Sequence, residues 1–177
     1  ADDTVVILLA DHGDMLGERG LWYKMNFFEG STRVPLVVHA PGRFPARRVD
    51  TPVSLVDLLP TLMEIAGASP ADAVEPLVGR SLLPLCEGAD EGRTVHGEYM
   101  AEGSCAPIVM IRRGALKFVH CPADPDQLYD LSADPQERVN LAADPAQAAT
   151  VTAFREEVAA RWDLERLTEE VLTDQAR

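Results

Sequence analysis

An uninterrupted apolar run near the start of the chain is the feature that most constrains its fold. After Thr4, residues 5–10 carry no polar side chain. A run without polar alternation predicts a parallel β-strand that is buried on both faces. Residues 11–14, which read Asp-His-Gly-Asp, follow directly. They are therefore expected at the carboxyl edge of a sheet, where open α/β sheets bind their ligands.

The two residues after this run have the chemistry of metal ligands. Asp11 offers a carboxylate and His12 an imidazole, and Gly13 opens the chain behind them. Both groups bind divalent cations. Lys24, further along the same segment, could reach an anion held by such a cation. The pattern predicts one edge of a metal-dependent site for an oxyanion, although polar residues after a strand also serve as turn formers.

Composition narrows the classes of partner. The chain has 177 residues, of which 46% are hydrophobic, enough for the core of one domain or slightly more. Its 16 basic and 29 acidic residues give a net charge of −13. Such a surface repels phosphate backbones, so we expect no nucleic-acid partner. No apolar run approaches the roughly 20 residues of a membrane helix, so we expect no membrane partner either.

The cysteines bear on the cellular compartment of the protein, and the first residues bear on whether the chain is part of a longer polypeptide. Cys86, Cys105 and Cys121 are odd in number and lack the close pairs typical of zinc sites. This pattern favours reduced thiols in a cytoplasmic protein. Because the chain opens at a strand expected to be buried, we expect it to be the C-terminal part of a longer polypeptide.

The first half of the chain alternates between strand and helix patterns. A loop over residues 11–32 is rich in glycine and aromatic residues, and we expect it to line a site. A second strand is predicted over 35–39. A helix around 54–66 is predicted to begin after Asp57. The proline-rich stretch 68–94 is expected to be a surface connection.

The second half has a different pattern. Residues 108–111 and 116–120 flank a turn and predict a β-hairpin, and residues 127–131 predict a further strand. Asp144 followed by proline predicts a helix start. The apolar residues after it recur at helical spacing, so this helix is expected to cover the sheet with one face; they are Val151, Phe154, Val158 and Trp162.

Residues 11–24 resemble the metal-site segment of the sulfatases in the alkaline phosphatase superfamily. The blocks 33–38, 53–62 and 128–141 resemble the next strand, the following helix and the closing motif of that family. The resemblance covers roughly residues 1–142. Within the family, two stretches are most similar to the choline-sulfatases; these are residues 17–25 and 98–104.

The resemblance implies an α/β fold in two parts. Residues 1–94 would be the C-terminal portion of the sulfatase α/β domain, an alkaline-phosphatase-like sandwich of parallel strands with helices. Residues 95–177 would be the sulfatase C-terminal subdomain, a small antiparallel sheet with a packed helix.

The resemblance also implies a division of chemical roles. Asp11 and His12 would bind the divalent cation. Calcium is expected first, because it is the usual ion of the family and the choline-sulfatases resemble this chain in using histidine; manganese is expected second, because imidazole suits transition metals better than calcium. Lys24 would be catalytic and contact the sulfate. Sulfatases use a formylglycine made in a Cys/Ser-x-Pro-x-Arg motif, and none of the three cysteines begins such a motif. In the family this motif lies N-terminal to the matched segment, so the chain alone is expected to be catalytically incomplete.

For substrate, the resemblance implies choline sulfate, hydrolysed to choline and sulfate. A trimethylammonium group is held by aromatic faces and carboxylates. Glu102 is the first choice for the carboxylate that faces it, and Glu98 is the second. The alternatives are an aryl sulfate or a phosphonate monoester, or a non-catalytic metal-binding or interaction domain. The full-length enzyme is expected to be a cytoplasmic homo-oligomer.

Overall fold

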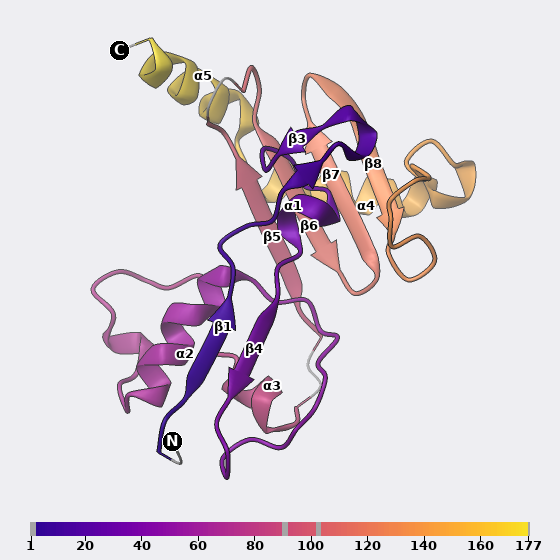
Figure 1. Ribbon diagram of the computed structural model, residues 1–177. Coiled ribbons are helices and arrows are strands. Elements are labelled where there is room, and N and C mark those ends of the chain that lie inside the picture. Colours follow the sequence, from indigo (N-terminus) through magenta and orange to yellow (C-terminus); the bar gives the residue numbers. More distant parts are fainter. Residues whose placement is uncertain (1–2, 90–91, 102–103, 177) are drawn as a thin grey trace. The chain divides into compact units, whose positions relative to one another are not determined.

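The computed structural model describes residues 3–89, 92–101 and 104–176 (Figure 1). By their contacts they form two compact units. The first unit lies within residues 1–12 and 34–95, and the second within residues 13–33 and 96–177. The chain leaves the first unit after His12 and returns at Val34, so the glycine-rich loop between them belongs to the second unit.

The first unit contains a two-stranded ribbon. β1 (Val6–Leu9) pairs with β4 (Leu36–His39), with Val6 opposite His39. Both strands were predicted, but the pairing is antiparallel, and β1 is not the buried parallel strand that its sequence suggested. Val6 is 52% exposed and Leu8 58% exposed. The reason is physical, because a ribbon of two strands, all that this sheet contains among the described residues, cannot cover both faces of an apolar strand.

Helix α2 (Leu58–Ile65) follows a 3-10 turn at Leu55–Asp57, so it begins after Asp57 as predicted. The Asp57 side chain closes a capping box with Ser54, whose backbone N–H donates to Oδ2 at 3.0 Å. The same carboxylate accepts from the backbone N–H of Arg80 at 2.8 Å and pairs with the buried Arg93 guanidinium at 3.5 Å. Asp57 therefore ties the start of α2 to the chain that follows it.

The stretch 68–94 differs from the expected surface connection. It contains helix α3 (Leu83–Glu87), and Leu82, Leu83 and Leu85 are buried. Pro84 lies in the first turn of this helix, where a proline is tolerated because its missing N–H has no helical partner. The prediction of a surface connection from the prolines was therefore wrong for this part, because one proline lies in the first turn of a helix with buried side chains.

The second unit contains a sheet of four strands in the order β5-β6-β7-β8. β6 pairs antiparallel with β7, and β7 with β8. The predicted hairpin is confirmed, with Gly114 at φ +54° in its turn. The strands are β5 (Thr94–Tyr99), β6 (Ile108–Arg113), β7 (Leu116–Cys121) and β8 (Asp124–Asp130).

Helix α4 (Ala148–Arg161) covers this sheet and completes its core. It follows a 3-10 turn, Pro145–Gln147, which Asp144 caps by accepting from the Ala146 N–H at 2.9 Å. The rings of Phe118 and Phe154 stack with their centroids 5.2 Å apart. The predicted helix face is confirmed, because its four apolar residues all lie in the core; they are Val151, Phe154, Val158 and Trp162.

Helix α5 (Leu164–Gln175) follows, and none of its described side chains is buried. No helix among the described residues combines the length and the apolar character needed to cross a membrane. The fold of mixed helices and sheets, with an antiparallel sheet under a packed helix in its C-terminal part, agrees with the predicted class.

Candidate functional site

Asp11 and His12 lie just after β1 in the first unit. Oδ2 of Asp11 is 3.5 Å from Nε2 of His12, and Oδ1 accepts from the His12 backbone N–H at 3.0 Å. The Asp11 side chain is 87% exposed and that of His12 is 34% exposed. The carboxylate and the imidazole therefore stand side by side and accessible at the end of the strand.

The pair fits a divalent cation in type but supplies only two ligands. An oxygen donor and a nitrogen donor within 3.5 Å of each other match the mixed coordination of such ions. Across the described ranges, no cluster of three or more His, Cys, Asp or Glu residues is placed to hold a metal ion. These residues suit one edge of a larger ligand set better than a complete centre.

The loop after the pair is folded by its own backbone. β2 (Met15–Leu16) pairs with β3 (Trp22–Tyr23), and the Gly13 N–H donates to the Ser31 carbonyl at 2.8 Å. A Cβ on Gly13 would lie 2.1 Å from the carbonyl oxygen of Gly30, so only glycine allows this close approach. The loop is thus closed at its base.

Lys24 follows β3 directly, and the residue before it, Tyr23, has a left-handed backbone with φ +68°. The Lys24 carbonyl accepts from the Asn26 N–H at 2.7 Å. Lys24 belongs to the second unit, whereas Asp11 and His12 belong to the first. The roles of all three stay predictions.

Of the two acidic residues predicted to face an ammonium group, Glu98 lies among the described residues and Glu102 does not. Glu98 lies on β5, and its Oε1 accepts from the Trp162 indole N–H at 2.6 Å. Glu102 lies outside the described residues. The rings of Trp22 and Tyr23 are exposed, at 61% and 67% respectively, on the loop that carries Lys24. The rings of the loop are therefore accessible to a ligand.

A polar network adjoins Glu98. Glu157 on α4 lies 3.0 Å from Nε2 of His96 and also pairs with Arg113. Burial alone would raise the pKa of the Glu157 carboxyl, but the hydrogen bonds from His96 and Arg113 outweigh it and lower the pKa. The His96 ring meets the Trp162 ring edge-on at 5.8 Å. Sequence reasoning missed this network, for which the apolar spacing that placed Trp162 on the sheet was the only local signal.

Sequence reasoning also missed a buried charge cluster around Lys117. This lysine occupies the β7 segment Leu-Lys-Phe-Val, and its residue is only 1% exposed. Its ammonium pairs with Glu29 at 2.8 Å and with Glu137 at 2.5 Å. A lysine inside an apolar strand was a signal of a buried ion pair, but its partners lie too far along the chain to be identified by spacing.

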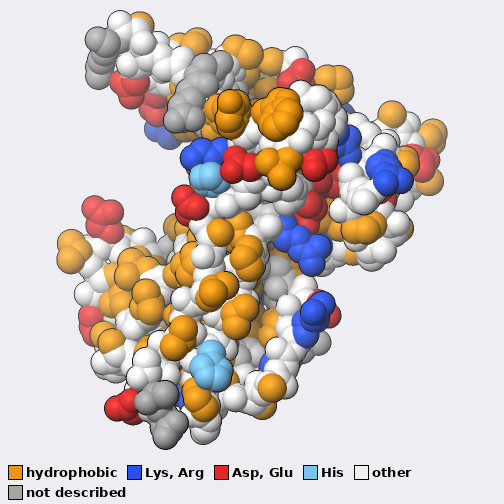
Figure 2. Space-filling view, in the orientation of Figure 1, with side chains coloured by type: hydrophobic (Ala, Val, Ile, Leu, Met, Phe, Trp, Pro, Cys, Tyr) orange, Lys and Arg blue, Asp and Glu red, His pale blue; other side chains and the backbone are white. Residues whose placement is uncertain are grey.

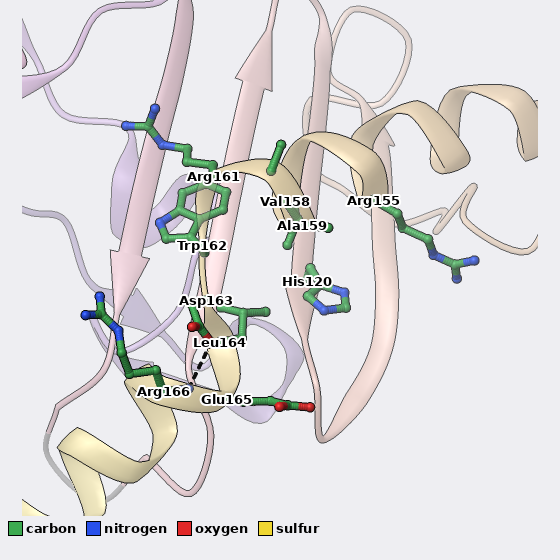
Figure 3. A pocket seen from close by; sticks show the side chains of 11 residues that line it. His120, Arg155, Val158, Ala159, Arg161, Trp162, Asp163, Leu164, Glu165 and Arg166 are labelled. Atoms are coloured by element: carbon green, nitrogen blue, oxygen red, sulfur yellow. Dashed lines mark hydrogen bonds between the residues drawn. The ribbon is translucent and has the colours of Figure 1, made fainter.

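A hollow of about 810 Å³ lies elsewhere in the second unit (Figure 3). Its lining includes His120 from β7, Arg155 from α4 and Arg166 from α5. Oδ1 of Asp126 lies 2.6 Å from Nδ1 of His120 and Oδ2 lies 2.6 Å from Nε of Arg155, so both side chains already have an acidic partner. Asp163 caps α5 by accepting from the Arg166 N–H at 3.1 Å, the dashed line of Figure 3. None of the predicted site residues that the structure describes lines this hollow.

Comparison with known proteins agrees with the resemblance seen in the sequence. The family described as N-sulphoglucosamine sulphohydrolase, C-terminal, matches residues 17–163. A choline-sulfatase of Rhizobium meliloti (strain 1021) is 50% identical over 180 residues, which is 99% of this chain and 35% of the relative. Arylsulfatase K of Danio rerio is 45% identical over 82 residues, 46% of this chain and 15% of the relative.

Solved structures show the same likeness. A 2-O GAG sulfatase superposes with a TM-score of 0.79 and 28% identity, covering 97% of this chain and 38% of that chain. A phosphonate monoester hydrolase of Agrobacterium radiobacter superposes with a TM-score of 0.73 and 29% identity, covering 96% and 36%. This chain therefore spans only about a third of the length of such relatives. By the extent of the family match and by its fold, the chain belongs to the sulfatases, in the family of N-sulphoglucosamine sulphohydrolase C-terminal regions.

Proposed function

We propose that this chain is the C-terminal part of a sulfuric ester hydrolase that converts choline sulfate to choline and sulfate. The observation that carries the proposal is the 50% identity to a choline-sulfatase, which extends over 99% of this chain. A likeness over nearly the whole chain includes both the segment with Asp11 and His12 and the segment with Glu98. Hydrolysis would then require the remainder of a longer protein.

In this proposal Asp11 and His12 hold one divalent cation, calcium first and manganese second. Bound there, the cation polarises the oxygens of the sulfate. The Lys24 ammonium contacts the same group or its bridging oxygen and offsets charge that develops on it. The formylglycine nucleophile and the other metal ligands come from residues N-terminal to this chain. The adjacency and exposure of the Asp11 and His12 side chains support this assignment.

Glu102, with Glu98 as second choice, faces the trimethylammonium group of choline. Cations without hydrogen-bond donors bind to aromatic faces and to carboxylates. The exposed rings of Trp22 and Tyr23 support an aromatic contact. We also propose that the full-length enzyme is a cytoplasmic homo-oligomer. The free thiols of the cysteines favour that compartment.

A second candidate keeps the fold and changes the substrate to an aryl sulfate or a phosphonate monoester. The superposition with a phosphonate monoester hydrolase at a TM-score of 0.73 favours it. A third candidate is a non-catalytic metal-binding or interaction domain, which fits the incomplete ligand set of Asp11 and His12.

The metal site is tested by Asp11→Ala in the full-length protein. We expect loss of bound metal, measured by elemental analysis, together with loss of choline sulfate turnover. Asp14→Ala is the matched control, since it removes a nearby exposed carboxylate that the proposal gives no role. An Asp11→Ala protein with the metal content and turnover of the wild type would overturn the assignment.

Substrate choice is tested by Glu102→Gln, assayed on choline sulfate and on an aryl sulfate. Loss of a carboxylate facing the cation should cost about 1–3 kcal/mol, or roughly tenfold to a hundredfold in kcat/KM, for choline sulfate only. Lys24→Ala should damage both reactions, because it acts on the sulfate that the substrates share. Equal losses on both esters, or none, would remove Glu102 from the ammonium site and make Glu98 the next residue to test.

A further inference from the structure

The loop that carries Lys24 has little apolar burial to hold it in place. Among residues 13–33 only Met15 and Ser31 are buried. Leu16, Trp22 and Tyr23 are all more than half exposed. Since burial of apolar area is the main force that fixes a loop on a domain, another interaction must fix this one.

Lys117 supplies such an interaction from the sheet. Its Nζ donates to the Phe27 carbonyl at 2.7 Å and to Oε1 of Glu29 at 2.8 Å, and both residues belong to the loop. On the other side it pairs with Oε1 of Glu137 at 2.5 Å. The Lys117 side chain is 2% exposed and that of Glu137 is 3% exposed. One ammonium thus joins the sheet, the loop and the turn that contains Glu137.

Glu137 contacts the loop in its own right. Its Oε2 accepts from the Glu29 backbone N–H at 2.8 Å. The residue has φ +56°, in a turn where its own N–H donates to the Asp134 carbonyl at 3.0 Å. Because this backbone conformation is unfavourable for a residue with a side chain, the turn is held in a costly shape that presents Glu137 to the loop.

A second anchor lies on the other side of Lys24. Arg19 donates to the Gln136 carbonyl at 2.9 Å and to the Glu137 carbonyl. Its guanidinium lies 4.3 Å from the centroid of the Phe28 ring, which in turn packs against the Tyr129 ring of β8 at 6.2 Å. The turn around Glu137 therefore holds the loop both before and after Lys24.

We infer that Lys117 and Glu137, together with Arg19, are positioning residues that hold the loop of residues 13–33 so that Lys24 is fixed for contact with the sulfate group. This inference rests on the proposed function of Lys24. A buried ion pair is weak evidence of stabilisation, since apolar residues of the same volume often stabilise a protein as well or better. Its use here is to specify where a poorly packed loop lies, and displacement by about 1 Å can cost a hundredfold in rate.

The catalytic test is a double-mutant cycle in the full-length protein with Glu137→Gln and Lys24→Ala. With choline sulfate we expect Glu137→Gln to lower kcat/KM by about tenfold to a hundredfold when Lys24 is present. When Lys24 is already alanine, the same change should lower kcat/KM less than about twofold. Equal losses in the two backgrounds would show that Glu137 does not act through Lys24, and would overturn the inference.

A second test uses hydrogen exchange, and not activity, to measure whether these residues hold the loop in place. In Glu137→Gln, hydrogen exchange of the amides of residues 16–28 should rise, while exchange in β6 and β7 stays that of the wild type. Asp126→Asn is the matched control, because Asp126 on β8 is similarly buried and its carboxylate pairs with His120 of β7 and Arg155 of α4, neither of which belongs to the loop. It should leave exchange in residues 16–28 unchanged. Unchanged exchange in Glu137→Gln would overturn the inference.

Arg19→Met keeps the test falsifiable if Glu137→Gln does not fold. Arg19 is exposed, so its removal leaves the buried cluster intact and should give the same pattern with smaller effects. Unchanged exchange and an additive loss in kcat/KM for this variant would also overturn the inference. If the wild-type protein hydrolyses no sulfate ester, the proposed function fails. Exchange in residues 16–28 then still decides whether the anchors hold the loop.

Discussion

β1 in the first unit and β6 in the second are both strongly apolar strands, but they differ in what surrounds them. Val109 and Ile111 of β6 are fully buried under α4. Val6 and Leu8 of β1 are more than half exposed. Figure 2 shows hydrophobic side chains gathered over the first unit, where exposed apolar residues also include Leu59 of α2. The second unit carries its own core, whereas the first exposes apolar surface that a folded protein normally covers.

The difference between β1 and β6 indicates how much of the core of each unit is supplied by this chain. The relative that is 50% identical is nearly three times as long, because this chain covers 35% of it. We propose that the missing part of such a protein covers β1 and β4. In this proposal β1 belongs to a core that the first unit shares with the rest of the protein, and its apolar side chains do not face solvent there.

The largest expected effect is on the free energy of unfolding, and it compares a side chain in the core of the second unit with one on the exposed strand β1. Phe118→Ala removes a ring that is fully buried and stacked on Phe154, so it should lower the free energy of unfolding by about 3–5 kcal/mol. Leu8→Ala should cost less than about 1 kcal/mol, because Leu8 is already 58% exposed. Urea unfolding followed by circular dichroism measures both. Similar losses for the two variants would contradict the contrast.

Local patterns in the sequence predicted much of the second unit. The hairpin of β6 and β7, the cap at Asp144 and the helix face from Val151 to Trp162 all depend on neighbours within a few residues, and all are confirmed. Local patterns failed where a segment depends on distant partners. The burial of α3 and the exposure of β1 are set by surrounding elements, which spacing along the chain does not reveal.

The candidate site shows the same limit. The sequence placed Asp11 and His12 at the end of a strand, and the structure has them there. It could not give the partners of Lys117, because Glu29 and Phe27 lie about ninety residues earlier in the chain. Nor could it show that Glu98 accepts from the Trp162 indole, a contact between residues 64 positions apart. Contacts of this kind depend on how the sheet, the loop and the helix pack together.

A moderate effect on stability is expected when the two tryptophans of the second unit are replaced. Trp162 is buried and Trp22 is exposed, so the pair compares the two environments within one unit. Trp162→Phe removes the N–H that donates to Glu98 and should lower the free energy of unfolding by about 1–3 kcal/mol. Trp22→Phe should change it by less than about 0.5 kcal/mol, since Trp22 is 61% exposed. Thermal unfolding of the two variants checks this. A larger loss for Trp22→Phe would mean that the loop depends on its rings more than its burial indicates.

The smallest effect is a dependence on pH at the junction of α4 with the sheet. The pKa of Glu157 is lowered because the hydrogen bonds from His96 and Arg113 outweigh the opposing effect of burial. A lowered pKa means that the ionised carboxylate stabilises the fold fully above its unfolded pKa, near 4.5, and that this contribution is lost as the pH falls through the folded value. The free energy of unfolding of the wild type should exceed that of Glu157→Gln by about 1 kcal/mol or less at pH 6. The difference should shrink toward pH 3.5. Glu156→Gln, one position earlier and exposed, is the control, and a difference for Glu157→Gln that grew as the pH fell would reverse the sign argued here.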